Sequence, residues 1–251
     1  MKISIIIPTF NSSETIQDTI NSVVSQNYKN YEIIIVDKNS KDKTIEIIKK
    51  NRLIDIKFII ENDNGIYDAI NKGIKLSTGK IISLLHSDDI YYDNKVLDNV
   101  VKAFTTYETK IVYGDLLYVK KNNIDSVLRF WKPKSFVKGC FLKGWHPPHS
   151  SFFVQKELFN KYGFYKTTIG NSADVELMYR FLEINNIYST YINYIFVKMR
   201  YGGKSNKTFS AILKQNIEII RFLGINKNYY KILFFFMHKL INRLKQFLVR
   251  P

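Results

Sequence analysis

In the first half of the chain, short apolar runs alternate with segments in which apolar residues recur every three or four positions. The runs are rich in isoleucine, which is typical of buried strands, and the periodic segments are typical of amphipathic helices. Strands are therefore expected over residues 3–7, 31–36, 56–60 and 80–85, and helices over 12–26, 43–51, 68–76 and 93–104. Apolar strands that alternate with helices predict a mostly parallel sheet with helices on both faces.

Each of the four expected strands is followed by a polar segment. These segments are Pro8-Thr9-Phe10-Asn11, Asp37-Lys38-Asn39-Ser40, Asp63-Asn64-Gly65 and His86-Ser87-Asp88-Asp89. Parallel sheets bind ligands at the carboxyl ends of their strands, so these segments are the candidate site. Neither a G-x-G-x-x-G sequence nor a Walker loop occurs, which argues against a dinucleotide or P-loop site.

The residues after the first and the fourth expected strands suggest more specific roles. Ser12 or Ser13 is expected to cap the first helix. Adjacent Asp88 and Asp89 offer hard oxygen ligands for a divalent cation that would hold a phosphate group. The alternative is that these two aspartates cap the helix that follows.

The net charge of +16 is distributed unevenly along the 251 residues. Residues 1–125 hold 17 basic and 17 acidic residues, whereas residues 126–251 hold 21 basic and 5 acidic ones. The excess positive charge of the second half indicates an anionic partner, such as a phosphorylated ligand or a membrane surface. A nucleic-acid groove over the whole protein is not expected.

The single cysteine, Cys140, excludes an intramolecular disulfide and a cysteine-cluster zinc site. It is expected to be a small core residue in a reducing compartment. No segment approaches the roughly 20 apolar residues of a membrane span, and the N-terminus lacks the pattern of a signal peptide. A cytoplasmic location is therefore expected, peripheral at the inner face of the cytoplasmic membrane.

Four blocks of the first half resemble, in order and spacing, those of the family 2 glycosyltransferases with the GT-A fold. The blocks are ISIIIPTFNSSETI, VDKNSKDKT, NDNGIYDAINKGIKLSTGKII and LLHSDD. The second half continues with PPHSSFFVQKELFNKYGFY, NSADVELMYRF and VKMRYGGKSN, which are similar to the branch that makes bacterial surface polysaccharide and lipopolysaccharide. The resemblance covers nearly the whole chain.

The resemblance implies an α/β fold of the GT-A type, Rossmann-like, with a C-terminal basic amphipathic helical tail. Residues 1–125 would be the nucleotide-sugar-binding half of this domain, residues 126–222 its acceptor-binding half, and residues 223–251 the tail. The implied activity is inverting transfer of a sugar from a nucleotide-diphosphate sugar to a lipid-linked glycan acceptor. The alternatives are a sugar nucleotidyltransferase, which should open with a Gly-rich activating loop, and a non-enzymatic basic protein that binds nucleic acid or membrane.

The resemblance also assigns residues to the donor site. The nucleotide and donor-sugar positions are Pro8, Thr9, Glu14, Asp37, Asp68, Asn71 and Asp88. Asp37 would hydrogen-bond the base of the donor, and Asp68 would face the ribose and the sugar. Asp37 could instead form an Asx turn, and Asp68 could cap its helix.

The segment Ser87-Asp88-Asp89 resembles the family's Asp-x-Asp signature, but His86 stands where the first acidic residue usually lies. Mn²⁺ or Mg²⁺ would be held by Asp88 and Asp89, either of which could be the direct ligand, with the other touching the ribose. Such an ion would neutralise charge on the leaving diphosphate. His86 is expected to be a polar loop residue, with a second-sphere group as the alternative.

Asp174 in ADVELMYRF aligns with the family's catalytic base, which takes the proton of the acceptor hydroxyl. The alternative is a helix N-cap. Glu176 is expected to point elsewhere, because residues two apart do not share a helix face. The segments that hold His149, Arg200 and Lys204 would close over the donor diphosphate and shape the acceptor site, although His149 could equally be a packed structural histidine.

The last part of the chain has no acidic residue after Glu218. Its apolar residues recur at helical spacing, and they include Leu233, Phe236, Met237, Leu240, Leu244, Phe247 and Leu248. A basic, Phe-rich amphipathic helix is suited to adsorption on an anionic membrane. The alternative is that its apolar face packs on its own domain or on a second subunit in a homodimer.

Overall fold

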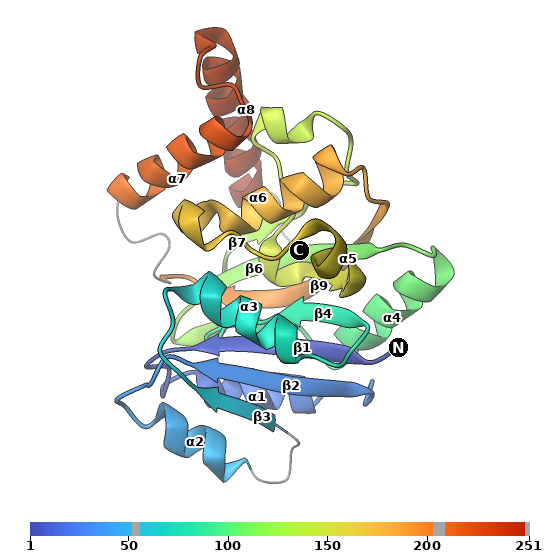
Figure 1. Cartoon of the computed structure of the whole chain (residues 1–251), viewed down its shortest axis with the longest axis vertical. Coiled ribbons are helices and arrows are strands. Elements are labelled where there is room, and N and C mark those ends of the chain that lie inside the picture. Colours follow the sequence, from blue (N-terminus) through green and yellow to red (C-terminus); the bar gives the residue numbers. More distant parts are fainter. Residues whose placement is uncertain (52–55, 203–208, 249–251) are drawn as a thin grey trace.

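The computed structural model describes residues 1–51, 56–202 and 209–248 (Figure 1). Within these residues the strands form one sheet in the order β3-β2-β1-β4-β8-β6-β9-β5, with β7 paired to β6 beside this path. The first half supplies β1 (Ile3–Thr9), β2 (Tyr31–Asp37), β3 (Ile56–Ile60) and β4 (Ile81–Leu84). These four strands are parallel to one another, as the sequence predicted.

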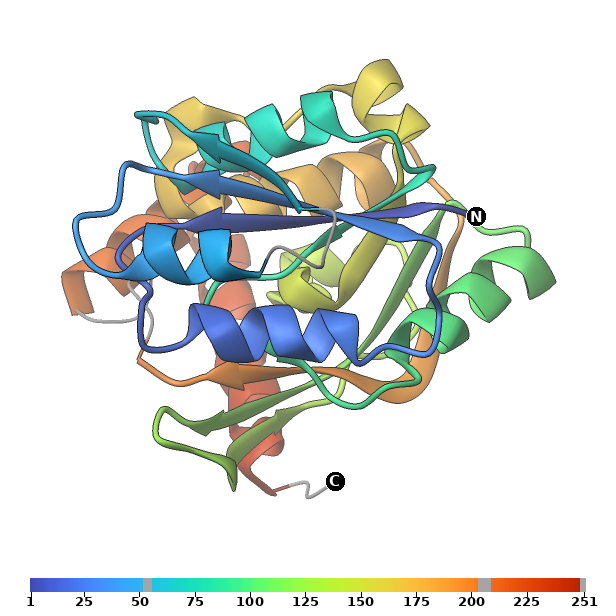
Figure 2. The same ribbon diagram turned by 90° about the horizontal axis from the view of Figure 1, so that it is seen from below.

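Helices cover both faces of this parallel part. The helices of the first half are α1 (Ile16–Val24), α2 (Thr44–Lys50), α3 (Ile66–Leu76) and α4 (Val96–Thr106). Figure 2 shows α1 and α3 on opposite sides of the strands. Successive residues of a strand point to opposite faces, so Ile6 joins the core cluster under α3 whereas Ile5 and Ile7 join the cluster under α1. The predicted architecture is confirmed.

The second half makes the sheet mixed. Its strands and the strands that link the halves are β5 (Ile90–Tyr91), β6 (Ile111–Lys120), β7 (Asn123–Trp131), β8 (Phe152–Gln155) and β9 (Ser189–Arg200). β8 lies between β4 and β6 and is antiparallel to both, whereas β6 and β9 are parallel. Because β6 of the first half pairs with β9 of the second, both halves of the chain contribute to one continuous sheet.

The remaining helices lie mostly over one region of the sheet (Figure 1). They are α5 (Glu157–Tyr162), α6 (Ala173–Tyr179), α7 (Phe209–Phe222) and α8 (Tyr229–Leu248), with short turns η1 (Cys140–Lys143), η2 (His149–Ser151), η3 (Thr167–Ser172) and η4 (Arg180–Ile184). The expected helical tail is α8. Cys140 is free and half-buried against the core, and burial raises the pKa of its thiol to about 12.

The N-terminus of α1 differs from the expectation. The N-cap residue is Thr15 rather than Ser12 or Ser13, and no side chain caps this helix. The Ser12 hydroxyl instead lies 2.8 Å from the Ser87 hydroxyl, and the Thr15 hydroxyl donates to the Ser87 carbonyl. These hydroxyl groups are engaged in joining the loop after β1 to the loop after β4, so they are not available for the helix end.

Candidate functional site

The antiparallel pairing of β8 with β4 brings two histidines together. The register pairs Ile81 with Gln155 and Ile82 with Val154, so the residues just after β4 lie beside those just before β8. The Nε2 atoms of His86 and His149 are 2.7 Å apart, which is hydrogen-bond distance. His86 lies in the loop after β4, as expected, and is in addition a hydrogen-bond partner of His149.

His149 also faces the expected catalytic base. Its Nδ1 atom lies 3.4 Å from Oδ2 of Asp174. Burial lowers the pKa of both His86 and His149 to about 4, so near neutral pH both imidazoles are uncharged. If Nδ1 of His149 carries the proton that faces Asp174, its Nε2 accepts a hydrogen bond from Nε2–H of His86. The three side chains then form one continuous chain of polar contacts.

Asp174 lies at the start of α6, where it is nearly buried. Its Oδ1 atom accepts a hydrogen bond of 2.8 Å from the Val175 N–H, and the Tyr67 side chain, whose hydroxyl donates to the Asn171 carbonyl at 3.4 Å, lies close to the carboxyl group. Burial raises the pKa of Asp174, and the neighbouring His146 counteracts part of this rise. The N-cap of α6 is Ser172, so the alternative in which Asp174 caps the helix does not hold.

Glu176 is held away from this group, as expected. Its carboxylate pairs with Arg180 at 2.9 Å and with Lys166 at 2.7 Å. Arg180 in turn donates to the carbonyl groups of Tyr162, Gly163 and Phe164. Glu176 therefore fixes the segment before α6 and leaves Asp174 as the carboxylate that faces the histidines.

The two aspartates of the loop after β4 differ in exposure. Asp88 is partly exposed, whereas Asp89 is 1% exposed and accepts one hydrogen bond of 3.1 Å, from the Ser150 hydroxyl. Burial, followed by the charge of Asp88, raises the pKa of Asp89 well above its ordinary value. The hydrogen bond from Ser150 and the positive charge of Arg200 offset only part of this rise, and a buried carboxylate with a second carboxylate beside it is a donor set that suits a cation.

Protein groups alone do not complete a metal site. Within residues 1–51, 56–202 and 209–248, no group of three or more His, Cys, Asp or Glu side chains is arranged to hold an ion. Mg²⁺ and related ions are commonly bound by one or two carboxylates together with substrate phosphates and water. Asp88 and Asp89 fit that kind of site, and the direct ligand among them stays a prediction.

Arg200 stabilises the same loop from behind. Its guanidinium group donates to the Asp88 carbonyl at 2.8 Å, to the Lys121 carbonyl at 3.2 Å and to the Asp18 carboxylate at 2.5 Å. The side chain is almost buried, and these partners engage three of its five N–H donors. The contacts favour a structural role for Arg200 over the expected contact with the donor diphosphate.

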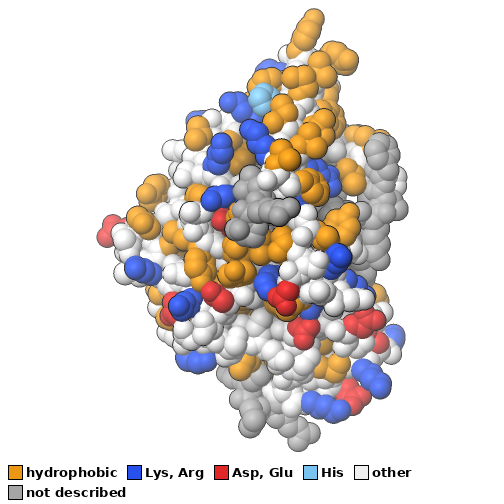
Figure 3. Space-filling view, turned by 180° about the vertical axis from the view of Figure 1, so that it is seen from behind, with side chains coloured by type: hydrophobic (Ala, Val, Ile, Leu, Met, Phe, Trp, Pro, Cys, Tyr) orange, Lys and Arg blue, Asp and Glu red, His pale blue; other side chains and the backbone are white. Residues whose placement is uncertain are grey.

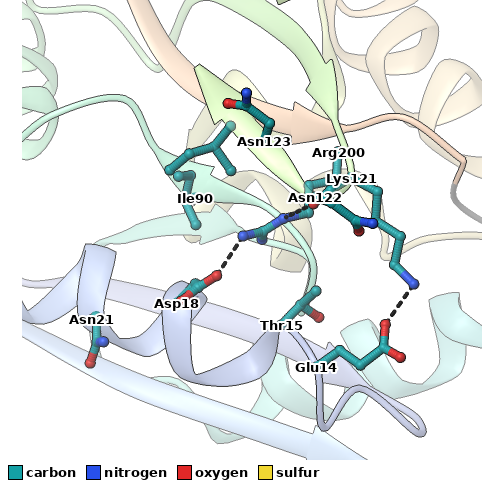
Figure 4. A pocket seen from close by; sticks show the side chains of 10 residues that line it. Glu14, Thr15, Asp18, Asn21, Ile90, Lys121, Asn122, Asn123 and Arg200 are labelled. Atoms are coloured by element: carbon teal, nitrogen blue, oxygen red, sulfur yellow. Dashed lines mark hydrogen bonds and ion pairs between the residues drawn. The ribbon is translucent and has the colours of Figure 1, made fainter. Parts of the chain in front are cut away.

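An open pocket of about 650 Å³ lies beside Arg200 (Figure 4). The exposed carboxylate of Glu14 lines it and pairs with Lys121 at 2.6 Å. Among the described residues, Glu14 and Arg200 are the expected site residues that line this pocket; Asp37, Asp89 and Asp174 do not. Glu14, which precedes α1, thus lies beside the turn between β6 and β7.

Asp37 forms the Asx turn that was the alternative to a contact with the base of the donor. Its two carboxylate oxygens accept hydrogen bonds from the Ser40 N–H at 2.7 Å and from the Ser40 hydroxyl at 2.6 Å. The residue is 0% exposed. Direct contact with a base stays a prediction. Pro8 and Thr9 of β1, which pair with Val36 and Asp37 of β2, are also buried.

The polar groups at the start of α3 are also engaged within the protein. Asp68 accepts a hydrogen bond from the Asn64 N–H at 3.1 Å, which lowers its pKa and stabilises the N-terminus of the helix. The Asn71 amide makes two bonds with the backbone of Tyr165, so it joins α3 to the segment before α6. Lys204 lies outside the described residues.

Several contacts of the site have no signal in the sequence. The pairing of His86 with His149, the bond from Ser150 to Asp89 and the proximity of Tyr67 to Asp174 all join segments at least 60 residues apart. The position of β8 in the sheet determines the first two contacts, and single-sequence patterns reveal neither strand order nor the packing of helices that makes the third.

Comparison with known proteins identifies sequences similar to this chain. Residues 4–163 match the sequence model described as "Glycosyl transferase family 2". An uncharacterised glycosyltransferase of Rickettsia typhi is 30% identical over 202 residues, which are 74% of this chain and 60% of that protein. A PGL/p-HBAD biosynthesis glycosyltransferase of Mycobacterium bovis is 26% identical over 230 residues, covering 88% of this chain and 86% of that protein. The chain thus spans about 60% of the length of the Rickettsia relative.

Solved structures share the fold. TarS of S. aureus in complex with UDP-GlcNAc superposes with a TM-score of 0.67 at 16% identity, covering 98% of this chain and 73% of that chain. The mannosyltransferase PcManGT of Pyrobaculum calidifontis, in complex with GDP-Man and Mn²⁺, superposes with a TM-score of 0.65 at 14% identity, covering 96% and 69%.

Proposed function

Because the chain belongs to glycosyl transferase family 2, we propose that it transfers a sugar from a nucleotide-diphosphate sugar to a hydroxyl group of a glycan acceptor, with inversion at the anomeric carbon. We further propose that the acceptor is lipid-linked and that the product is a bacterial surface polysaccharide. The family match favours glycosyltransferase activity over both alternatives raised by the sequence, a nucleotidyltransferase and a non-enzymatic basic protein.

The observation that carries this proposal is the environment of Asp174. Of its two oxygens, Oδ1 is held by the Val175 N–H, and Oδ2 faces His149. A carboxylate whose pKa is raised by burial is a stronger base than an exposed one. Such a group is suited to accept the proton of an acceptor hydroxyl.

In the proposed reaction, Asp174 takes the hydroxyl proton as the acceptor oxygen forms a bond to the anomeric carbon. The bond between that carbon and the diphosphate oxygen breaks on the opposite side, and the diphosphate leaves with the electron pair. A divalent cation bound by Asp88 and Asp89 would neutralise charge on the diphosphate. The buried contacts of Arg200, through the Asp88 carbonyl, hold that loop in place.

The experiment that tests this proposal compares Asp174→Asn with a matched control. The assay measures transfer from radiolabelled sugar nucleotides to membranes that carry lipid-linked acceptors. Asp174→Asn should lower kcat by about 10²- to 10⁴-fold, because the base is lost while shape is kept. Asp125→Asn, at a side chain that is 84% exposed, should transfer as the wild type does. Equal activity of Asp174→Asn and the wild type would exclude Asp174 as the base.

A further inference from the structure

The packed face of α8 is not its apolar face. The residues of α8 that face the domain are Ile232, Phe235, His238, Lys239, Asn242 and Gln246. Phe235 is 1% exposed, the Lys239 ammonium group donates to Asn216 at 2.6 Å, and the Asn242 amide donates to the Lys143 carbonyl at 3.2 Å. The helix is therefore attached to its own domain largely through polar groups around one buried aromatic side chain.

The opposite side of α8, here called the outer face, is apolar and exposed. Its residues are Leu233, Phe236, Met237, Leu240, Ile241, Leu244, Phe247 and Leu248. Their exposed fractions run from 36% at Phe236 to 81% at Leu248. At 3.6 residues per turn these positions form one continuous stripe along the helix. Figure 3 shows hydrophobic side chains gathered over this upper part of the molecule, with Lys and Arg side chains among them.

This arrangement is the reverse of a surface helix in a soluble domain, which directs its apolar stripe to the core. The alternative in which the apolar face of the tail packs on its own domain is therefore wrong. Large contiguous apolar patches on a protein surface mark interaction sites. To be removed from water, the apolar side chains of the outer face need a partner that offers an apolar environment.

The charges beside the outer face identify the kind of partner. Lys231 and Lys245 lie along one flank of the stripe and Arg243 along the other. Neither α8 nor any residue after Glu218 carries an acidic side chain. In a homodimer built on this face, the basic flanks of two copies would approach each other without counter-charges from the helix. An anionic bilayer supplies both an apolar phase and negative headgroups.

We propose that α8 lies in the plane of an anionic lipid bilayer, with its outer face among the acyl chains and its basic flanks at the headgroups. Long Lys and Arg side chains can reach the headgroup level from such a position. Within the part of the chain that the structure describes, none of the helices has the length and apolar character needed to cross a membrane. The attachment is therefore to the surface, and it does not depend on the proposed sugar transfer.

The test is sedimentation of the full chain with lipid vesicles, in the absence of any sugar nucleotide. The wild type should sediment with vesicles that contain phosphatidylglycerol and should remain in solution with pure phosphatidylcholine. The double substitution Leu240→Glu/Leu244→Glu, at side chains 59% and 54% exposed, should lower the partition coefficient at least about tenfold. Leu76→Glu, at a side chain of α3 that is 46% exposed, is the matched control and should bind as the wild type does.

Three outcomes would overturn the proposal. They are equal vesicle binding by the double variant and the wild type, equal binding to neutral and anionic vesicles, and absence of vesicle binding together with a dimer that the double variant dissociates. The last outcome, measured by sedimentation velocity, would assign the outer face to a second copy. Thermal stabilisation by nucleotides, measured on the same preparations, reports on the donor site separately, so failure of one proposal can be told from failure of the other.

Discussion

Asp174 combines two opposing influences on its basicity. Burial raises its pKa, while His146 favours its ionised form, and the backbone N–H of Val175 fixes one of its oxygens. A base of this kind must be ionised to act. The rate of transfer should therefore rise with pH as Asp174 loses its proton, and this acid limb should be centred above the ordinary carboxyl value of 3.8.

The pH dependence can be measured as kcat/KM between acidic and neutral pH. The limb should be centred above 3.8 in the wild type and in Asp125→Asn, because the control lies far from the base. A midpoint of this acid limb at or below pH 3.8 would show that burial does not raise the pKa of Asp174. The residual activity of Asp174→Asn should lack this limb.

His149 is expected to orient Asp174 rather than to contact the reacting atoms. His149→Ala should lower kcat by roughly 10- to 100-fold with little change in the KM for the donor, because the base loses its orientation while the donor site remains. His149→Gln, whose amide can still donate toward Asp174, should recover part of this loss. His238→Ala, on α8, is the control. An increase in KM alone would assign His149 to donor binding instead.

At the level of single residues, the sequence predicts the base and the two aspartates of the cation site but not their surroundings. Asp37 and Asn71 match a known pattern, yet their polar atoms are engaged with Ser40 and Tyr165. Residue type alone does not distinguish a side chain that binds a ligand from one that fixes a loop. That distinction depends on neighbours that tertiary packing supplies.

Among the secondary-structure elements, β2 contains a buried carboxylate remote from the site. Glu32 is bonded by Ser4, Thr78 and Gly79 and pairs with Lys2 and Lys57. Burial alone would raise the pKa of Glu32, but the hydrogen bonds from Lys57, Ser4 and Thr78 outweigh it and hold the pKa well below the ordinary value. The resulting stabilisation is present above the unfolded-state pKa and is lost as the pH falls toward the folded-state value.

Glu32→Gln should therefore lower the free energy of unfolding by about 2 kcal/mol at neutral pH, because the charge-assisted hydrogen bonds that the buried carboxylate accepts from Ser4 and Thr78 are weakened. Urea denaturation at neutral and at acidic pH measures this loss, which should shrink in acid. Glu46→Gln removes an exposed pair with Lys50 on α2 and should change the stability by less than about 0.5 kcal/mol. Equal effects of the two substitutions would contradict the assigned role of Glu32.

The elements themselves are largely predictable, because apolar periodicity reflects which face of a strand or helix is buried. All four strands and four helices expected in the first half occur, with boundaries that differ by a few residues. The orientation of α8 is different: its apolar period predicts the helix, whereas the outward direction of its apolar face is suggested by the basic composition of the tail and not by the period. Periodicity reports a preference for an apolar environment and does not say whether protein or lipid supplies it.

For the whole molecule, the donor site should be detectable by its effect on stability. UDP, GDP or CDP at about 100 times Kd should stabilise the protein by about 2.7 kcal/mol, which raises Tm by roughly 5–10 °C in a chain of this size. The shift should require Mn²⁺ or Mg²⁺. Asp88→Asn/Asp89→Asn should remove the metal-dependent part, whereas Asp125→Asn should keep it. Absence of a shift with every nucleotide would count against the donor site.

The division of the chain at residues 125 and 222 stays a prediction, and the position of β8 indicates how residues 1–125 would behave alone. Because β8 occupies the space between β4 and β6, a fragment that ends at residue 125 would leave facing edges of these two strands unpaired. Unpaired edges are templates for association between chains. The acidic loop after β4 and Asp174 in α6 are thus brought together only when the second half has been synthesised and paired, so premature release of the first half should yield aggregates rather than a nucleotide-binding module.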